Sequence, residues 1–282
     1  MSKILLQTTI PYREDDWHIG RFSLLADLLA QDHDVVARNR EDGIDPVLAN
    51  LPDSDFDQVW LFAVDTGDGI HREECSAISQ FRARGGGLMV TRDHMDLGSS
   101  VCDLGGVGAA HHFHTKNVDE AIAREGRDDR DTAAIDWPNF HSGSNGDVQE
   151  IEIVEPVHPL LLADGRRLRY FPAHPHEGAV SAPPDDSSAH VIARGISKVT
   201  GRRFNLTVAF DSQGAEGNAV AESTFHHFAD YNWDPRKGCP SFVSEPPSDR
   251  IVREPALLDD TRAFCRNLAA WLGARRMSGA PA

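Results

Sequence analysis

The hydrophobic and polar positions in the N-terminal third of the chain alternate between two periods. Four short apolar runs predict buried strands at residues 3–7, 34–37, 58–64 and 88–90. Between them, residues 19–29 and 72–84 carry apolar side chains at helical spacing, and Gly85 follows the second segment as a helix-ending residue. This alternation indicates a parallel sheet with helices on both faces.

The second half of the chain has a different pattern. Strand-like runs separated by Gly, Pro and Asp turns occur at residues 148–154, 167–171, 190–193, 203–210 and 218–222. Residues 257–272 predict a final amphipathic helix, whereas residues 98–146 are rich in Gly, Asp and His and predict loops with short helices. We therefore expect one α/β domain over residues 1–276 with a β-rich second half, and a disordered tail at 277–282.

Composition and charge narrow the function. The chain has 40% hydrophobic and 26% charged residues, which is typical of a soluble globular protein. Its 28 Lys and Arg against 44 Asp and Glu give a net charge of −16, which disfavours binding to nucleic acid or to an anionic membrane surface. The apolar run 59–64 is too short to span a bilayer and the N-terminus lacks a signal-peptide pattern, so the expected location is cytoplasmic.

The cysteines predict neither a disulfide framework nor a metal-binding pair. They are few and widely scattered, without a Cys-x-x-Cys spacing, at Cys75, Cys102, Cys239 and Cys265. Cys102 falls beyond the predicted strand 88–90, inside a helix expected around residues 95–102, and is a poor candidate for a nucleophile.

Three segments that follow predicted strands carry candidate chemistry, and the first contains Asp93 and His94. In an open α/β sheet, ligands bind outside the carboxyl ends of the strands, which is where these two residues lie. The alternative is that Asp93 only caps the helix expected around residues 95–102.

The second segment is 172–178, with His174, His176 and Glu177. In an extended chain His174 and His176 point to the same face, and His-x-His beside a carboxylate is a recurring arrangement for first-row metals. The alternative is a proline-stiffened surface loop with incidental histidines.

The third segment is 222–234, in which aromatic residues alternate with polar ones around His226 and His227. Adjacent histidines do not share a face of a regular element, so we expect at most one of the pair to be a direct metal ligand. The alternative is an aromatic core with hydrogen-bonded histidines. Four further histidines give weaker signals and their roles stay open: His111, His112, His114 and His141.

The order of several short motifs resembles a known superfamily. Residues 57–62, the helix that follows, and residues 85–90 resemble the class I glutamine-amidotransferase-like proteins, and the segments 157–160 and 219–227 are similar to its trehalose-utilisation (ThuA-like) branch. The resemblance implies a flavodoxin-like three-layer sandwich with a mostly parallel sheet. It also implies, by analogy only, a link to sugar metabolism.

The chain departs from the amidotransferases at the site of their nucleophile. True amidotransferases carry a cysteine at the elbow after the glycine-rich turn and strand, where this sequence has Arg92, Asp93 and His94. Glutamine hydrolysis through a thioester is therefore not expected. The sequence also lacks a Gly-x-Ser-x-Gly elbow, a His-Glu-x-x-His motif and a P-loop.

These observations lead to the hypothesis of a metal-assisted hydrolase that acts on a small polar substrate, a carbohydrate derivative or an amide. The expected metal is Zn²⁺, whose bound water has a pKa of about 7. We expect its ligands among His174, His176, His226 and His227, a ligand or general base among Asp93, His94 and Glu177, and substrate contacts from Arg92, Tyr12 and Arg13. The alternatives are a metal-free hydrolase or lyase that uses Asp93 and His94, and a non-catalytic ligand-binding module. Assembly into a homo-oligomer stays open.

Overall fold

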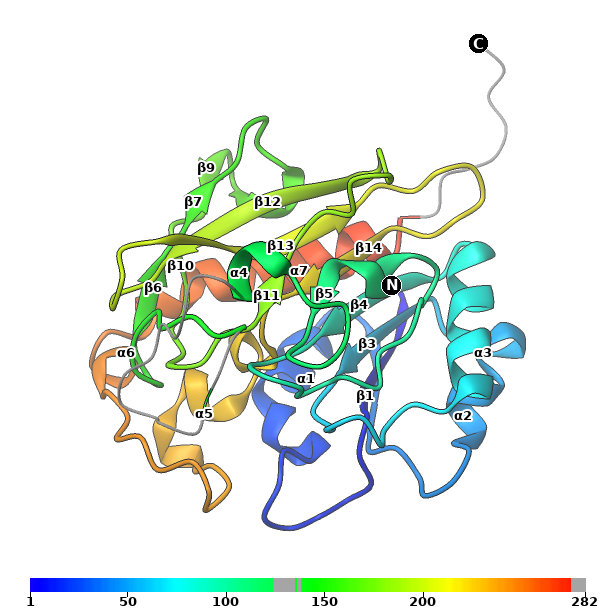
Figure 1. Ribbon diagram of the computed structural model, residues 1–282, viewed down its shortest axis with the longest axis horizontal. Coiled ribbons are helices and arrows are strands. Elements are labelled where there is room, and N and C mark those ends of the chain that lie inside the picture. Colours follow the sequence, from blue (N-terminus) through cyan, green and yellow to red (C-terminus); the bar gives the residue numbers. More distant parts are fainter. Residues whose placement is uncertain (124–134, 136–137, 275–282) are drawn as a thin grey trace.

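An eight-stranded sheet forms the centre of the molecule in the computed structural model, which describes residues 1–123, 135 and 138–274 (Figure 1). The strand order is β2-β1-β3-β4-β14-β13-β12-β7. Five neighbouring strands are parallel: β2 (Asp34–Arg38), β1 (Lys3–Thr8), β3 (Gln58–Phe62), β4 (Gly87–Thr91) and β14 (Ala219–Glu222). The other three are joined antiparallel: β13 (Arg203–Phe210), β12 (Ala189–Ile196) and β7 (Glu152–Ile153). The predicted mostly parallel sheet is confirmed.

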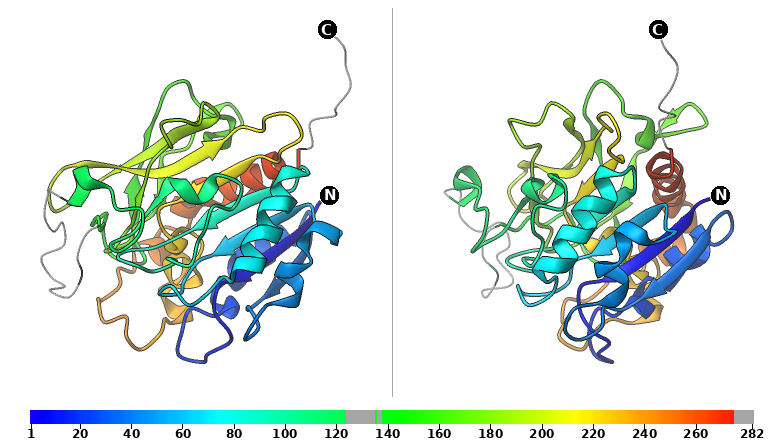
Figure 2. Two further views of the ribbon diagram at one scale, coloured as in Figure 1. Left: turned by 45° about the vertical axis from the view of Figure 1, so that its right-hand side comes forward. Right: turned by 90° about the vertical axis from the view of Figure 1, so that its right-hand side faces the viewer.

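The inner parallel strands β3, β4 and β14 are buried on both faces, and helices cover each face of the sheet. In β3, Trp60 and Phe62 pack into the cluster that contains α1 (Ser23–Leu29) and α7 (Asp259–Leu272). Val59 and Leu61, which point the other way, pack into the cluster with α2 (Pro46–Ala49) and α3 (Arg72–Ala83). Figure 2 shows α3 and α7 on opposite sides of the sheet. The result is a three-layer sandwich.

Shorter elements make the loops and two-stranded ribbons around this sandwich. The antiparallel ribbons pair β6 (Val148–Glu150) with β10 (Tyr170–Pro172), β5 (His111–His112) with β11 (Ala179–Val180), and β8 (Leu162–Ala163) with β9 (Arg166–Arg167). The short α-helices are α4 (Glu120–Ala123), α5 (Asp230–Trp233) and α6 (Arg250–Arg253). The 3-10 helices are η1 (Ile19–Phe22), η2 (Leu51–Asp53), η3 (Val107–Ala110), η4 (Pro159–Leu161), η5 (Phe225–His227), η6 (Pro235–Lys237) and η7 (Pro255–Leu258).

Several expected elements differ from the sequence prediction. The strand expected over 167–171 is divided between β9, which pairs with β8, and β10, which pairs with β6. The strand expected over 148–154 is divided, because β6 pairs with β10 whereas β7 pairs with β12 of the central sheet. The helix expected around 95–102 is wrong: Met95 and Gly98 have φ values of 51° and 90°, which a right-handed helix does not accommodate. A Cβ at Gly98 would lie 2.8 Å from the Cβ of Ala63, so this close turn requires glycine.

The same loop is held by the chain's disulfide bond, which the sequence analysis did not anticipate. Cys75 at the start of α3 is bonded to Cys102, 27 residues later, beyond the carboxyl end of β4. Cys239 and Cys265 are free thiols. Asp65 also anchors this loop, because its carboxylate accepts hydrogen bonds from the backbone N–H and hydroxyl of Ser100. Cys102 is therefore neither helical nor a free nucleophile.

No helix in the part of the chain that the structure describes is long and apolar enough to cross a membrane. The tail expected to be disordered, residues 277–282, lies outside the described residues.

The Cys75–Cys102 bond predicts a stability difference. We expect Cys102→Ser to lower the free energy of unfolding by about 3 kcal/mol, since a cross-link across a loop of this length restricts the unfolded chain by that order. Urea unfolding of the wild type with and without dithiothreitol should show the same loss, and the reductant should leave Cys102→Ser unchanged. Cys239→Ser, which removes a free thiol, is the control. Equal urea midpoints for oxidised and reduced wild type would contradict the bond.

Candidate metal centre

Two adjacent parallel strands place Asp93 and His226 at the same edge of the sheet. Thr91 at the end of β4 pairs with Glu222 at the end of β14. The two chains stay together beyond the strands, because the backbone N–H of Phe225 donates to the carbonyl of Arg92 at 2.9 Å. The side chains that follow each strand are thus brought together at the carboxyl edge, as the sequence analysis expected.

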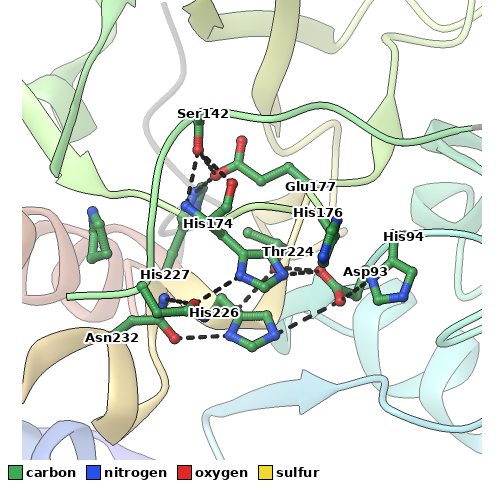
Figure 3. Close-up of polar contacts among 12 residues, drawn as sticks. Asp93, His94, Ser142, His174, His176, Glu177, Thr224, His226, His227 and Asn232 are labelled. Carbon is green, nitrogen blue, oxygen red and sulfur yellow. Dashed lines mark hydrogen bonds and ion pairs between the residues drawn. The ribbon is translucent and has the colours of Figure 1, made fainter. Parts of the chain in front are cut away.

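His174 completes a compact cluster with these two residues, which we call the Asp93 cluster (Asp93, His174 and His226). Its Nε2 atom lies 3.6 Å from Oδ1 of Asp93, and Nε2 of His226 lies 3.7 Å from Oδ2 (Figure 3). One ligand atom from each of the three buried residues lies within 4.8 Å of the other two. Two different strands and a separate loop therefore converge on one point.

A chain of hydrogen bonds sets the tautomer of both imidazoles. The carbonyl of Ala173 only accepts, so the group of Asn232 that contacts it at 3.1 Å is the amide NH₂, which also donates to Oδ1 of Asn145 at 2.8 Å. Oδ1 of Asn232 then accepts from Nδ1–H of His226 at 2.8 Å, and Oδ1 of Asn145 accepts from Nδ1–H of His174 at 3.0 Å. Both neutral imidazoles must therefore present the lone pair of Nε2 to Asp93.

The charge state of the cluster follows from burial. Burial lowers the pKa of His174 to about 4 and lowers the pKa of His226 well below its usual range, so both rings are neutral at pH 7. Burial raises the pKa of Asp93, whereas Coulombic attraction to His174, His94 and His226 in their charged forms lowers it well below its usual range. Asp93 also accepts hydrogen bonds from the Thr224 hydroxyl at 2.6 Å and from Nδ1–H of His94 at 2.8 Å.

A carboxylate that faces two nitrogen lone pairs leaves the centre of the cluster without a positive charge. The separations of 3.6 and 3.7 Å are too long for hydrogen bonds. They are close to the spacing of roughly 3.3 Å expected between tetrahedral ligands about 2.0–2.1 Å from Zn²⁺. Two imidazole nitrogens and a carboxylate oxygen are also a donor set that first-row divalent ions prefer. The residues of the Asp93 cluster therefore fit a metal ion.

Two further histidines flank the cluster, and each is held by a carboxylate. Nδ1–H of His94 donates to Asp93, and Nε2–H of His176 donates to Oε1 of Glu245 at 2.8 Å. The latter bond lowers the pKa of Glu245 to about 2. The two rings lie 5.2 Å apart between centroids. The His94 side chain is 19% exposed, so solvent reaches it.

His227 points away from the Asp93 cluster into a second buried group, the buried ion triad (Glu222, His227 and Glu177). Nδ1 of His227 lies 2.9 Å from Glu222 and Nε2 lies 3.1 Å from Glu177. Burial lowers the pKa of His227, but the two carboxylate hydrogen bonds dominate and raise it to about 9, so the ring is an imidazolium at pH 7. Of the adjacent histidine pair, His226 faces the Asp93 cluster, whereas His227 pairs with buried carboxylates. One of these is Glu177, which therefore lies in the buried ion triad and not in the Asp93 cluster.

The residues expected to bind substrate lie elsewhere. Arg92 is fully buried, with its guanidinium 4.5 Å from the ring centroid of Phe113, a residue of the apolar cluster on the α3 face of the sheet. Tyr12 is 61% exposed and its ring packs near His18, while Arg13 is also exposed. Trp17, from the loop between β1 and η1, does contact the cluster. Its ring centroid lies 4.7 Å from that of His226.

The remaining histidines of the long loop lie outside the Asp93 cluster. His111 is fully buried beside the carbonyl of Val90, and burial lowers its pKa to about 3. His112 is hydrogen-bonded to Ser181, and His114 is exposed.

Sequence reasoning missed the residues that orient the ligands. Asn232 lies in the segment 222–234 that had been singled out for its histidines, so a search for amides near them would have found it. Asn145 and Glu245 lie in loops that are distant in sequence from the histidines they contact. No nearby sequence pattern marks them as part of the site.

Comparison with known proteins identifies the architecture. No protein-family model matches this sequence, and no curated protein does. Among solved structures, a protein described as ThuA-like from Parabacteroides merdae superposes with a TM-score of 0.56 at 13% identity, over 99% of this chain and 93% of that chain. The chain has the ThuA-like fold.

Two further structures superpose less closely on this chain. A cytoplasmic protein from Salmonella typhimurium has a TM-score of 0.49 at 11% identity, over 98% of this chain and 100% of that chain. The glutaminase domain of Trypanosoma brucei CTPS with bound acivicin has a TM-score of 0.48 at 14% identity, over 98% of each chain. Beyond the end of β4, this chain has neither cysteine nor serine in residues 92–94.

The buried ion triad predicts a strong effect of His227→Gln. We expect a loss of about 3–5 kcal/mol in the free energy of unfolding, because Glu177 and Glu222 would face each other without the imidazolium. The double variant His227→Gln/Glu222→Gln should recover part of that loss. His190→Gln, at a half-exposed histidine, is the control, and chemical unfolding at pH 7 is the measurement. A double variant no more stable than the single one would contradict the charge-pairing explanation.

Proposed function

We propose that this protein is a metal-assisted hydrolase whose ion, Zn²⁺ in the first instance, is bound by Asp93, His174 and His226. The proposal is carried by one observation: the tautomers set through Asn232 and Asn145 turn two neutral nitrogen lone pairs toward a carboxylate. A site built only for hydrogen bonding would have a donor facing Asp93 at these two places, whereas a cation satisfies all three groups at once.

When bound by these residues, the ion would act as a Lewis acid and would lower the pKa of a water molecule beside it. His94 is suited to take the proton from that water, because its Nδ1–H is occupied by Asp93 and its Nε2 is left as the proton acceptor. Its partial exposure lets the proton pass on to solvent.

His176 is suited to the opposite role. Glu245 accepts from its Nε2–H and orients the ring, so the proton given to the leaving group would come from Nδ1. The His94 and His176 rings are in edge-to-face contact, with 5.2 Å between their centroids, so the proposed base and acid lie side by side. Asp93 then has two tasks, since one carboxylate both binds the ion and orients His94.

The substrate that suits this site is small and polar, a carbohydrate derivative or an amide, with Trp17 as an apolar contact beside His226. Nucleic acid and membrane surfaces are not proposed as partners, given the net charge of −16. A cytoplasmic location stays part of the proposal, although the Cys75–Cys102 bond counts against it because disulfides are rare in reducing compartments.

A metal-free hydrolase is the second candidate, favoured by the Asp93–His94 hydrogen bond alone. In that case Asp93 would orient His94 as a general base for water, and the same residues would act without an ion. The metal content of the purified protein distinguishes the two candidates, because only the metal-assisted hydrolase requires a bound ion.

The metal proposal predicts about one equivalent of a first-row divalent ion in protein purified without a His tag. His174→Ala should lose the ion. Asn232→Ala, which leaves all three ligands in place, should weaken binding by about 10–100-fold because the orienting hydrogen bond is lost. His112→Ala, which removes a histidine outside the cluster, should keep the ion. The measurement is metal content by elemental analysis. Wild-type protein that contains less than about a tenth of an equivalent of any first-row metal would contradict the metal proposal.

The proposed base predicts a separation between binding and turnover. We expect His94→Gln to retain the metal while kcat falls by about 10²–10⁴-fold, on whichever chromogenic ester, amide or glycoside the wild type hydrolyses. His112→Gln is the matched control and should keep wild-type kcat. Full activity in His94→Gln would remove His94 from the mechanism.

A further inference from the structure

A cavity of about 570 Å³ lies away from the metal centre, between the loop before η4, the start of β12 and the end of α7. Its size is within the range of small-molecule sites, about 300–1,000 Å³. The side chains on which the argument rests are His158, His190, Asp211, Trp271, Val157 and Ile192.

The sheet register separates this cavity from the Asp93 cluster. Phe210 at the end of β13 pairs with Ala219, the first residue of β14, so Asp211 emerges at the amino end of β14. The Asp93 cluster follows Glu222 and Thr91, at the opposite end of the same strands. The cavity is therefore independent of the proposed metal chemistry.

His158 faces the carboxylate of Asp211 with a donor that lies too far away for a hydrogen bond, at 3.8 Å. The backbone N–H of Leu160 donates to its Nδ1 at 3.3 Å, and burial lowers the pKa of the ring, so the neutral imidazole carries its proton on Nε2. The side chain is 9% exposed, and Nε2 is buried without a hydrogen-bond partner among the described residues. Buried donors are nearly always paired, so this N–H indicates a missing acceptor.

Asp211 faces the same gap from the other side. Its Oδ1 lies 3.8 Å from Nε2 of His158 and its Oδ2 lies 3.6 Å from Nε2 of His190, too far for direct hydrogen bonds. The group that fills the gap must accept from His158 and donate to Asp211. An ammonium group has no lone pair to accept with, and a carboxylate has no proton to donate and is repelled by Asp211. A hydroxyl does both.

Apart from Glu155, the rest of the wall is mainly apolar and aromatic. The ring of Trp271 lies 5.1 Å from that of His158 at an angle of 83°, and Val157 and Ile192 line the cavity beside it. Such a wall packs against C–H groups, while the His158–Asp211 gap takes a hydroxyl. We propose that this cavity binds a neutral polyhydroxylated small molecule, a sugar or a cyclic polyol, through one hydroxyl between His158 and Asp211.

The test titrates wild type with D-glucose, sucrose and myo-inositol, and in parallel with ethylammonium and acetate, by calorimetry and ligand-observed NMR. We expect at least one of the three polyols to bind with a Kd below about 10 mM. Asp211→Ala and His158→Phe should each weaken that binding by about tenfold or more, since each removes one of the two hydrogen bonds to the hydroxyl. Asp185→Ala, at an exposed carboxylate outside the cavity lining, should leave the Kd unchanged.

Asp93→Asn should also leave the Kd unchanged, which keeps this proposal separate from the metal centre. The circular dichroism and urea midpoint of Asp211→Ala, whose side chain is half exposed, show whether the variant is folded. The proposal is overturned if no polyol binds, if binding survives both cavity variants, if only ethylammonium or acetate binds at the cavity, or if crystals soaked in the polyols show water alone between His158 and Asp211.

Discussion

The arrangement of the Asp93 cluster depends on a single carbonyl oxygen, that of Ala173. Because this atom only accepts hydrogen bonds, it determines which end of the Asn232 amide faces it, and Asn232 in turn orients Asn145. The two amides hold the imidazoles of His226 and His174 by Nδ1, so that Nε2 of each ring faces Asp93. Burial keeps both rings neutral, so the cluster has three electron-pair donors and lacks the positive charge that would balance them.

The adjacent histidines show how one short segment serves two electrostatic tasks. His226 and His227 leave the 3-10 helix η5 in different directions. The first becomes a neutral ligand candidate, and the second becomes an imidazolium between Glu177 and Glu222. This division follows from their surroundings: a ring stacked on His174, with centroids 3.5 Å apart, is a poor place for a second positive charge, whereas a ring between two carboxylates requires one.

Much of the architecture is predictable from the sequence, because the inner strands of the central sheet are largely buried and carry runs of apolar residues. Residues 58–64 predict β3 and residues 203–210 predict β13 with its exact bounds. The errors fall where local rules compete with distant contacts. The helix expected around 95–102 fails because Asp65 and Ala63, from another strand end, hold the loop in a turn that needs a glycine at position 98. The Cys75–Cys102 bond has no local spacing signal either, because it joins two parts of the fold.

By itself, the sequence determined the period of each buried strand and the position of Asp93, His174 and His226 just beyond strands, since both follow from side-chain patterns within a few residues. It also determined that no cysteine or serine stands at residues 92–94. Only the tertiary structure decided that His226 rather than His227 joins Asp93, that Glu177 balances charge, and that Arg92 packs against Phe113. The physical reason is that a side chain's protonation and direction depend on partners such as Asn145 and Glu245, which only folding brings near.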